Sequence, residues 1–181
     1  MHEQTYAIVV YLRGPLAELV DGLRCRLDPA HVGKTAHITV LPPRPLVISE
    51  QAALEEARAQ CEEWEPFEVR IGGISTFLPA NGVVYMAPSQ GREQMRRLHS
   101  ELNRGHLASR EVFGYVPHIT IVQDLDEQRT HELERVVAEE LARYDGPRRF
   151  LVETLTFVRQ APSGEWIDLA EVQLGRQHVL A

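Results

Sequence analysis

The first half of the chain shows two spacings of apolar residues, one typical of strands and one typical of helices. Residues 6–12 form a continuous apolar and β-branched run, which predicts a buried strand. Helical spacing begins at Pro15 and ends at Asp28, because proline favours the first turn of a helix and Pro29 cannot continue one. Ser49 is suited to cap a second helix, and strict alternation over residues 67–71 predicts a half-buried strand.

The second half predicts the same kinds of element in a similar order. Residues 83–86 predict a short strand, and Ser89 is expected to cap the helix that follows it. Asp126 is expected to cap a further helix, which ends at Gly146-Pro147 and turns four apolar residues inward: Leu133, Val136, Val137 and Leu141. Residues 150–158 and 166–174 predict the last two strands.

The two halves also match each other in sequence. The matching segments are 9–12 with 83–86, 37–40 with 118–121, and 75–77 with 155–157, at offsets of 74, 81 and 80 residues. Because the order is kept and only a loop length changes, we interpret the chain as a tandem duplication, approximately 1–80 and 81–181. At about 150 residues per domain, this length predicts a single domain built from two similar α+β lobes.

The most informative match is the tripeptide His-Ile-Thr, which occurs twice. With eight residues of each type among 181, a shuffled chain would hold about 0.02 copies. Both copies lie in apolar runs that read as strands, so His37 and Thr39 share one face, as do His118 and Thr120. If a pseudo-twofold axis relates the lobes, the two pairs face each other across one cleft.

Two opposed histidines are suited to acid–base chemistry at a phosphate. A neutral imidazole can take a proton from an attacking hydroxyl or water, while a protonated one gives a proton to the leaving oxygen. Two threonine hydroxyls can hydrogen-bond the non-bridging phosphate oxygens. Such a set of side chains can displace a group at a phosphodiester without a metal. A single histidine in a strand is more often an ordinary surface or core residue, and it is the duplication that favours function here.

The segments His37-Ile38-Thr39-Val40 and Tyr115-Val116-Pro117-His118-Ile119-Thr120-Ile121 resemble the twin H-x-[ST]-x motifs of the 2H phosphoesterase superfamily, in its 2′-5′ RNA ligase-like branch. The resemblance covers nearly the whole chain. It implies an α+β fold of two pseudo-symmetric lobes, with antiparallel sheets lining a central groove and helices packed outside. Many relatives have leucine where Val40 and Ile121 stand, a mild departure that leaves an apolar residue in place.

The same resemblance implies the chemistry. It points to an enzyme that hydrolyses 2′,3′-cyclic phosphates of RNA or nucleotides without metal or cofactor, and that could also form or break 2′-5′ RNA linkages. By this resemblance His37 and His118 become the acid–base pair, and Thr39 and Thr120 bind the phosphate. The implied partners are RNA ends or cyclic nucleotides.

Several other residues are candidates for substrate binding. Lys34 and Arg44 flank the first motif and could add positive charge, although loop residues of this kind are commonly solvated. Aromatic residues that could stack on a base, or equally pack in the core, are Tyr11, Tyr85, Phe113 and Tyr115. Four further histidines have no matched partner in the other half of the sequence and are expected at the surface. They are His31, His99, His106 and His131.

Composition narrows the setting. The net charge is −7 and Lys34 is the one lysine among 19 basic residues, which argues against binding along a long nucleic-acid duplex. No apolar run approaches the ~20 residues of a membrane span, and no signal-peptide pattern is present. Cys25 and Cys61 form no C-x-x-C motif, so a reduced, cytoplasmic setting is expected. A monomer is expected, because two lobes complete one site.

Two other interpretations of the paired histidines remain open. A metal site would need three or four ligands, and the sequence offers no H-x-H, H-E-x-x-H or Cys/His cluster; histidine-triad hydrolases are excluded in the same way. A non-catalytic module that binds single-stranded RNA or a nucleotide is the main alternative from another class. The acidic charge and the absence of an RNP-type aromatic signature count against that alternative.

Overall fold

Two four-stranded antiparallel sheets form the framework of the computed structural model, which describes residues 4–31 and 33–175. The first sheet has the strand order β2 (His37–Pro45), β1 (Thr5–Tyr11), β7 (Thr154–Gln160) and β8 (Trp166–Gln173). The second sheet has the order β5 (Ile119–Val122), β4 (Val84–Gln90), β3 (Phe67–Thr76) and β6 (Arg149–Val152). Every pairing within them is antiparallel. The α+β class and the antiparallel sheets predicted by the family resemblance are confirmed.

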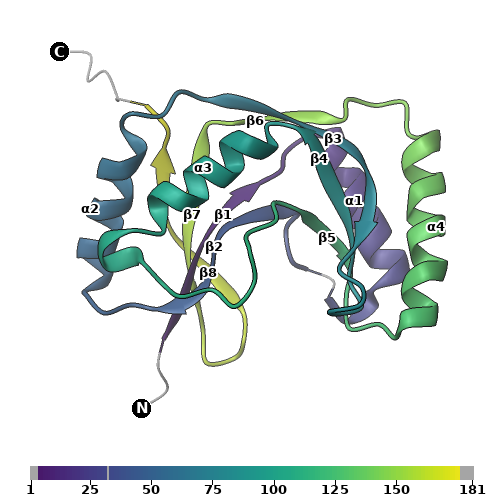
Figure 1. Cartoon of the computed structure of the whole chain (residues 1–181), viewed down its shortest axis with the longest axis horizontal. Helices are drawn as coiled ribbons and strands as arrows, with labels where there is room; N and C mark the ends of the chain where they lie inside the picture. The colour runs from purple at the N-terminus through teal and green to yellow at the C-terminus, as the bar shows by residue number, and fades with distance from the viewer. Residues whose placement is uncertain (1–3, 32, 176–181) are drawn as a thin grey trace.

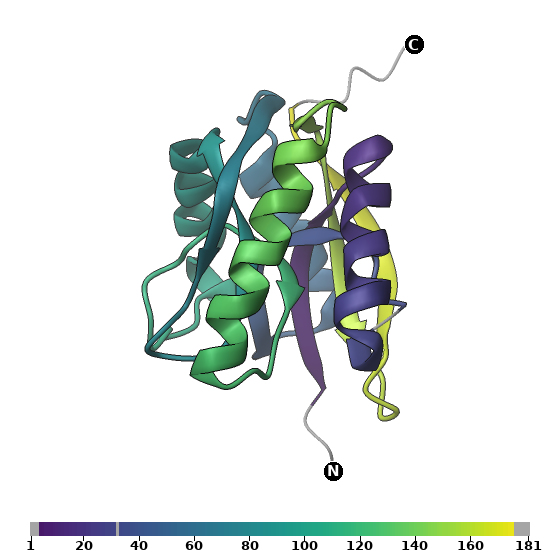
Figure 2. The ribbon, with the colours of Figure 1, turned by 90° about the vertical axis from the view of Figure 1, so that its right-hand side faces the viewer.

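Four helices cover the outer faces of the sheets. Helices α2 (Glu50–Cys61) and α3 (Arg92–Leu102) pack against β8 and β2 of the first sheet, while α1 (Pro15–Leu27) and α4 (Glu127–Arg143) pack against β5 and β3 of the second. Figure 1 places α2 at one end of the molecule and α1 and α4 toward the other, with α3 between them, and Figure 2 shows α1 and α4 side by side. Among the described helices, none is long and apolar enough to cross a bilayer.

The predicted helix starts are confirmed where a side chain caps the helix. Ser49 Oγ accepts a hydrogen bond from the Ala52 amide at 3.2 Å, and Asp126 Oδ1 accepts one from the Arg129 amide at 2.7 Å. Each bond satisfies one of the amides that a first helical turn leaves without an internal partner. Pro15 stands in the first turn of α1, as predicted.

Three element predictions are wrong in detail. Ser89 belongs to β4, where its hydroxyl donates to the Arg70 carbonyl, and α3 begins after Gly91, whose φ of 77° suits glycine. Val136 is 38% exposed, because the buried stripe of α4 follows the spacing of Leu133, Val137 and Leu141. That helix ends at Arg143, short of the predicted Gly146-Pro147 stop.

The segment predicted as one strand, 150–158, is divided between the two sheets. The chain leaves β6 of the second sheet at Val152 and enters β7 of the first sheet at Thr154. Both sides of the crossover carry apolar residues, so their pattern contains no sign of the break. The sheets consequently do not follow the two halves of the sequence: β3 from the first half lies in the second sheet, and β7 from the second half lies in the first.

Because of this exchange of strands, segments that match in sequence occupy equivalent positions in the two sheets. Strands β2, β1 and β7 stand in the same order in the first sheet as β5, β4 and β3 in the second. These are the strands that carry the three sequence matches. The tandem duplication itself stays a prediction, and the observed strand order is what such a duplication would produce after exchange of one strand.

Candidate active site

The two motif strands meet although they belong to different sheets. β2 and β5 are each the edge strand of their sheet, and the two contact one another. Along β2, Ile38 and Val40 are fully buried, whereas His37 and Thr39 lie on the opposite, half-buried face. Thr120 occupies the same half-buried position in β5, between residues that the core buries. The predicted alternation of buried and half-buried residues is therefore confirmed in both motifs.

A backbone carbonyl holds the ring of each motif histidine, His37 and His118, in the same way. His37 Nδ1 lies 2.7 Å from the Thr35 carbonyl oxygen, and His118 Nδ1 lies 2.7 Å from the Val116 carbonyl oxygen. A carbonyl can only accept, so in each ring Nδ1 carries the hydrogen. Nε2 of each ring is then the nitrogen that can take up or release a proton. In each motif the partner is the residue two positions before the histidine.

Burial keeps both imidazoles neutral at neutral pH. Burial is the largest influence on the pKa of His37 and lowers it below 6.5, and the nearby charges of Arg24, His118 and Lys34 lower it further. Burial also lowers the pKa of His118. The backbone carbonyl that accepts from each ring acts in the opposite direction and offsets part of the effect.

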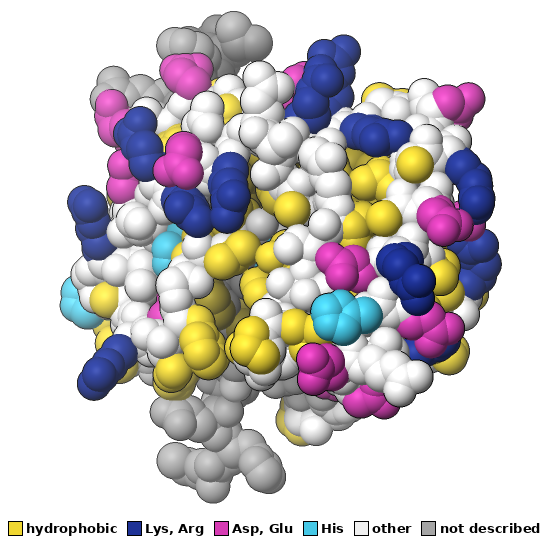
Figure 3. Space-filling view, turned by 45° about the vertical axis from the view of Figure 1, so that its right-hand side comes forward, with side chains coloured by type: hydrophobic (Ala, Val, Ile, Leu, Met, Phe, Trp, Pro, Cys, Tyr) yellow, Lys and Arg dark blue, Asp and Glu magenta, His cyan; other side chains and the backbone are white. Residues whose placement is uncertain are grey.

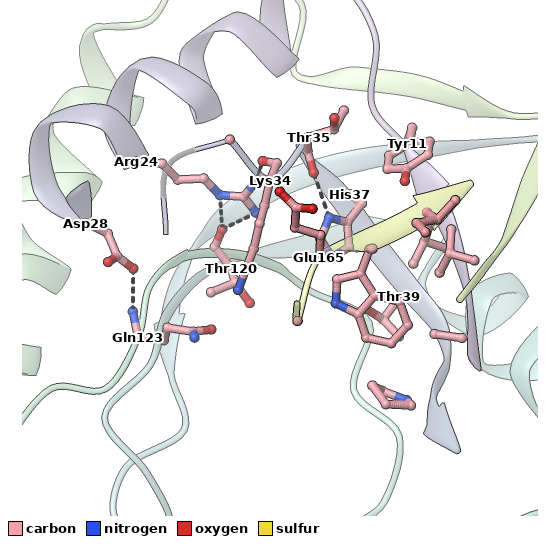
Figure 4. Close-up of a pocket in the computed structure, with 18 of the residues that line it drawn as sticks. Tyr11, Arg24, Asp28, Lys34, Thr35, His37, Thr39, Thr120, Gln123 and Glu165 are labelled. Atoms are coloured by element: carbon pink, nitrogen blue, oxygen red, sulfur yellow. Dashed lines mark hydrogen bonds between the residues drawn. The ribbon is translucent and has the colours of Figure 1, made fainter. Parts of the chain in front are cut away.

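A cavity of about 710 Å³ opens beside the first motif (Figure 4). His37, Thr39 and Thr120 line it, together with the basic residues Arg24 and Lys34. The other lining residues are Ala7, Val9, Tyr11, Asp28, Gly33, Thr35, Pro43, Ile121, Gln123, Val158, Ser163, Gly164, Glu165, Trp166 and Ile167. The cavity thus combines threonine hydroxyls, positive charge and an apolar wall.

His118 has aromatic neighbours on its own sheet. Its ring packs edge-on against Phe77, with 4.9 Å between ring centroids, and at 5.3 Å against Tyr85. Phe77 and Tyr85 are themselves 4.4 Å apart. His118 is not among the residues that line the cavity. Tyr85, predicted as a base-stacking candidate, is buried and supports the His118 ring instead.

Arg24 is a residue of this region that the sequence analysis missed. Its Nε and Nη2 donate to the Thr120 carbonyl at 2.9 and 2.7 Å, and its Nη1 donates to the Lys34 carbonyl at 2.8 Å. One buried guanidinium therefore joins α1, the loop before His37 and the second motif strand (Figure 4). A signal was available, because Arg24 stands on the apolar face of its helix, four residues after Val20.

The first motif strand is held from its other side by two stacked rings. Tyr115 donates from its hydroxyl to the Thr39 carbonyl at 2.9 Å, and His99 Nδ1 lies 2.7 Å from the Val40 carbonyl. The two rings are parallel within 5° and 4.0 Å apart. His99 is only 7% exposed, so its predicted surface position is wrong. The helical periodicity of α3 places it beside Leu98 and Leu102, which are also buried.

The remaining candidates divide between the cavity and places outside it. Lys34 is exposed and lines the cavity. Arg44 does not line it: its buried guanidinium donates to Asn103, to Glu111 and to the Leu107 carbonyl. Phe113 is 74% exposed and also lies outside the lining, as does Tyr115.

Two other unmatched histidines, His106 and His131, lie at the surface. The side chains of His106 and His131 are 65% and 60% exposed, as predicted for surface residues, while the His31 side chain lies outside the described part of the chain. Within residues 4–31 and 33–175, no group of three or more His, Cys, Asp and Glu side chains is placed to hold a metal ion.

Comparison with known proteins identifies the family. The sequence model of the 2′-5′ RNA ligase superfamily matches residues 13–164. The chain belongs to this superfamily of 2H phosphoesterases. A Bacillus licheniformis protein named “Putative phosphoesterase” is 25% identical over 162 residues, covering 89% of this chain and 93% of its own length. One of the same description from Oceanobacillus iheyensis is 31% identical over 124 residues, 67% and 71% of the two chains.

Solved structures support the same fold. The apo crystal structure of Escherichia coli LigT superposes with a TM-score of 0.66 at 18% identity, over 96% of this chain and 98% of that one. A structure from Thermus thermophilus superposes with a TM-score of 0.65 at 19% identity, over 96% and 100%. These likenesses concern the arrangement of sheets and helices. The family resemblance drawn from the two motifs is confirmed.

Proposed function

We propose that this protein is a phosphoesterase that opens 2′,3′-cyclic phosphates at RNA ends or on nucleotides. The observation that carries the proposal is the convergence of the two His-Ile-Thr motifs on adjoining edge strands of two sheets. Each motif supplies an imidazole with its Nδ1 bonded to a carbonyl and its Nε2 left for proton transfer. Thr39 and Thr120 line the cavity beside His37, where their hydroxyls can bind phosphate oxygens.

The proposed reaction is an in-line displacement at phosphorus. One histidine takes a proton from water through Nε2 while the water oxygen forms a bond to phosphorus. The bond from phosphorus to one ribose oxygen breaks, and the other histidine, protonated beforehand, gives its proton to that oxygen. The product is a ribose phosphomonoester with a free neighbouring hydroxyl. With a ribose hydroxyl in place of water, the same displacement would form a 2′-5′ linkage.

The lowered histidine pKa values fit this proposal once a substrate binds. In the free site both rings are neutral near pH 7, so either can serve as a base. A phosphate anion held between them favours the charged form of a nearby imidazole and raises its pKa. Substrate binding therefore supplies the protonated histidine that the leaving oxygen requires.

The family adds a second line of support for a nucleotide substrate. One crystal structure of E. coli LigT was determined with 3′-AMP, a nucleoside monophosphate of the kind that opening a cyclic phosphate yields. On the face shown in Figure 3, basic and acidic side chains are interspersed and form no continuous basic stripe. We therefore favour a nucleotide or an RNA end over a long duplex as the substrate.

Incubation with an oligonucleotide that ends in a 2′,3′-cyclic phosphate tests the proposal. We expect opening to a monoester in the presence of EDTA, and a loss of at least about 100-fold in rate for His37→Ala and for His118→Ala. His131→Ala, which changes an exposed histidine of α4, is the matched control and should retain full activity. A protein that binds the oligonucleotide without opening it would support a binding module and overturn the enzyme.

A further inference from the structure

The two sheets differ in what lies beside their motif strands. On the second sheet, Phe77, Tyr85 and His118 pack against one another, with centroid distances of 4.4–5.3 Å, and none of the three lines the cavity. The cavity instead extends over the first sheet, taking lining residues from β1, β2, β7 and β8. The pseudo-symmetry is therefore broken at the place where a substrate would extend beyond its phosphate.

Where β1 and β7 face the cavity, the first sheet is apolar. Ala7, Val9 and Val158 form a small cluster separate from the main core, to which the neighbouring Ile8 and Val10 belong. No described helix covers this cluster. Instead, the side chains of Tyr11 and Trp166 pack against it. These two residues and the three residues of the cluster all line the cavity. An apolar sheet face that opens on a cavity is suited to an uncharged, planar group.

We propose that this apolar face is a subsite for the nucleobase of the nucleotide whose phosphate lies between the two motifs, with Trp166 as the stacking platform. The inference rests on the proposed function and specifies how its substrate is recognised. A volume of about 710 Å³ is far more than a phosphate needs and lies within the usual range for small-molecule sites. Aromatic faces bind unpaired bases with little sequence preference.

Tyr11 lies between the two ends of the proposed site, which are the apolar face for the base and the first motif for the phosphate. Its hydroxyl donates to Asp168 at 2.6 Å, and its ring stands edge-on to His37, 6.3 Å between centroids and 88° between planes. Tyr11 is thus fixed between the apolar face and the first motif. Trp166 stands at the start of β8, next to the hairpin that joins β7 to β8, and its indole is half-buried.

Charged side chains of both signs line the cavity. Arg24 and Lys34 line the cavity on the side of α1, where they suit a phosphate. Glu165, from the β7–β8 hairpin, lines it beside Trp166, and Figure 4 shows its carboxylate between Lys34 and His37. A carboxylate accepts hydrogen bonds from the N–H groups of a base edge. The hairpin therefore supplies, in Glu165, an acceptor for a base held in the same cavity.

Equilibrium binding with three probes tests the subsite: 3′-AMP, ribose 5-phosphate and inorganic phosphate. Trp166→Ala should weaken 3′-AMP binding about 10- to 100-fold, the loss expected for one stacked base, and leave inorganic phosphate and ribose 5-phosphate within twofold. Trp166→Phe should recover part of the affinity for 3′-AMP. Phe113→Ala, an exposed aromatic outside the cavity, is the control and should change none of the three.

The outcomes separate this inference from the proposed function. If Trp166→Ala binds 3′-AMP as tightly as the parent protein, or loses all three probes equally, the subsite is overturned even if cyclic phosphates are opened. If the selective loss of 3′-AMP binding occurs in a protein that opens no cyclic phosphate, the subsite stands and the proposed hydrolysis fails. Retained phosphate binding in the variant shows that the phosphate end has kept its structure.

Discussion

The guanidinium of Arg24 donates two hydrogen bonds to a single acceptor, the carbonyl oxygen of Thr120, at 2.9 Å from Nε and 2.7 Å from Nη2. Thr120 is the hydroxyl residue of the second motif, whereas Arg24 stands on a helix of the first half of the chain. Because the same guanidinium also binds the Lys34 carbonyl, it joins the approaches to both motifs. The separation of the motifs thus depends on a residue that belongs to neither motif.

Replacement of Arg24 by methionine should affect stability and catalysis together. The change leaves the Thr120 carbonyl without its described donor, which should lower the free energy of unfolding by about 1–3 kcal/mol. It also removes a positive charge that lowers the pKa of His37, so the limb of the pH–rate profile that His37 governs should move to higher pH. Denaturant unfolding and the pH dependence of the rate measure the two effects.

The control for that variant is Arg26→Met, two residues further along the same helix. Arg26 is 58% exposed and forms a surface ion pair with Glu140, so its removal should change stability by less than about 1 kcal/mol and leave the pH–rate profile in place. An unshifted profile in Arg24→Met, with normal stability, would show that Arg24 has no electrostatic influence on His37.

Tyr115→Phe should reduce activity while leaving the fold intact. The variant keeps the ring that stacks on His99 and removes only the hydroxyl that binds the Thr39 carbonyl. We expect a loss of about 1 kcal/mol in stability and a severalfold lower turnover, because the first motif strand loses one of its restraints. Tyr144→Phe, whose hydroxyl makes only an exposed 3.5 Å contact with the Pro147 carbonyl, should match the parent protein in both measurements. Equal turnover in the two variants would contradict this role for Tyr115.

The motif residues could be predicted from sequence because their signal is local. A repeated tripeptide with a two-residue alternation specifies which side chains share a face, whatever the rest of the fold does. The helix starts at Ser49 and Asp126 were predictable for the same reason, since an N-cap depends on amides two to three residues away.

Residues whose roles depend on distant partners could not be assigned in this way. Arg44 lies close to the first motif in sequence, yet its partners Asn103, Leu107 and Glu111 come from the loop before the second motif. Trp166 reaches the cavity only because β7 and β8 join β1 in one sheet. The division of 150–158 between two sheets likewise depends on strand pairing, and the apolar pattern on its two sides is the same.

The two cysteines should differ sharply in reactivity toward thiol reagents. Cys25 is exposed on α1, whereas Cys61 is fully buried at the end of α2. Burial raises the pKa of the Cys61 thiol to about 12, so almost none of it is thiolate at neutral pH. Titration with a disulfide reagent should detect one fast thiol in the native protein and two after denaturation. Cys25→Ser should abolish the fast phase, and a fast phase that survives this change would show that Cys61 is accessible.

The stability of the protein should fall as the pH is lowered through the range in which the two motif histidines, His37 and His118, become protonated. In the folded state burial lowers the pKa values of His37 and His118 below 6.5, so between those values and 6.5 the unfolded chain binds more protons. The stabilising contribution of the two neutral imidazoles is fully present above about pH 6.5 and is lost as the pH falls toward the folded-state pKa values.

Denaturant unfolding at pH 7.5 and pH 5 measures the effect. The difference in the free energy of unfolding between the two pH values should be smaller for His37→Gln than for the parent chain, and smaller still for the double variant with His118→Gln. His131→Gln removes a histidine whose side chain is 60% exposed and serves as the control, which should retain the parent difference. An identical pH dependence in the parent protein and the double variant would show that neither imidazole is neutral by burial.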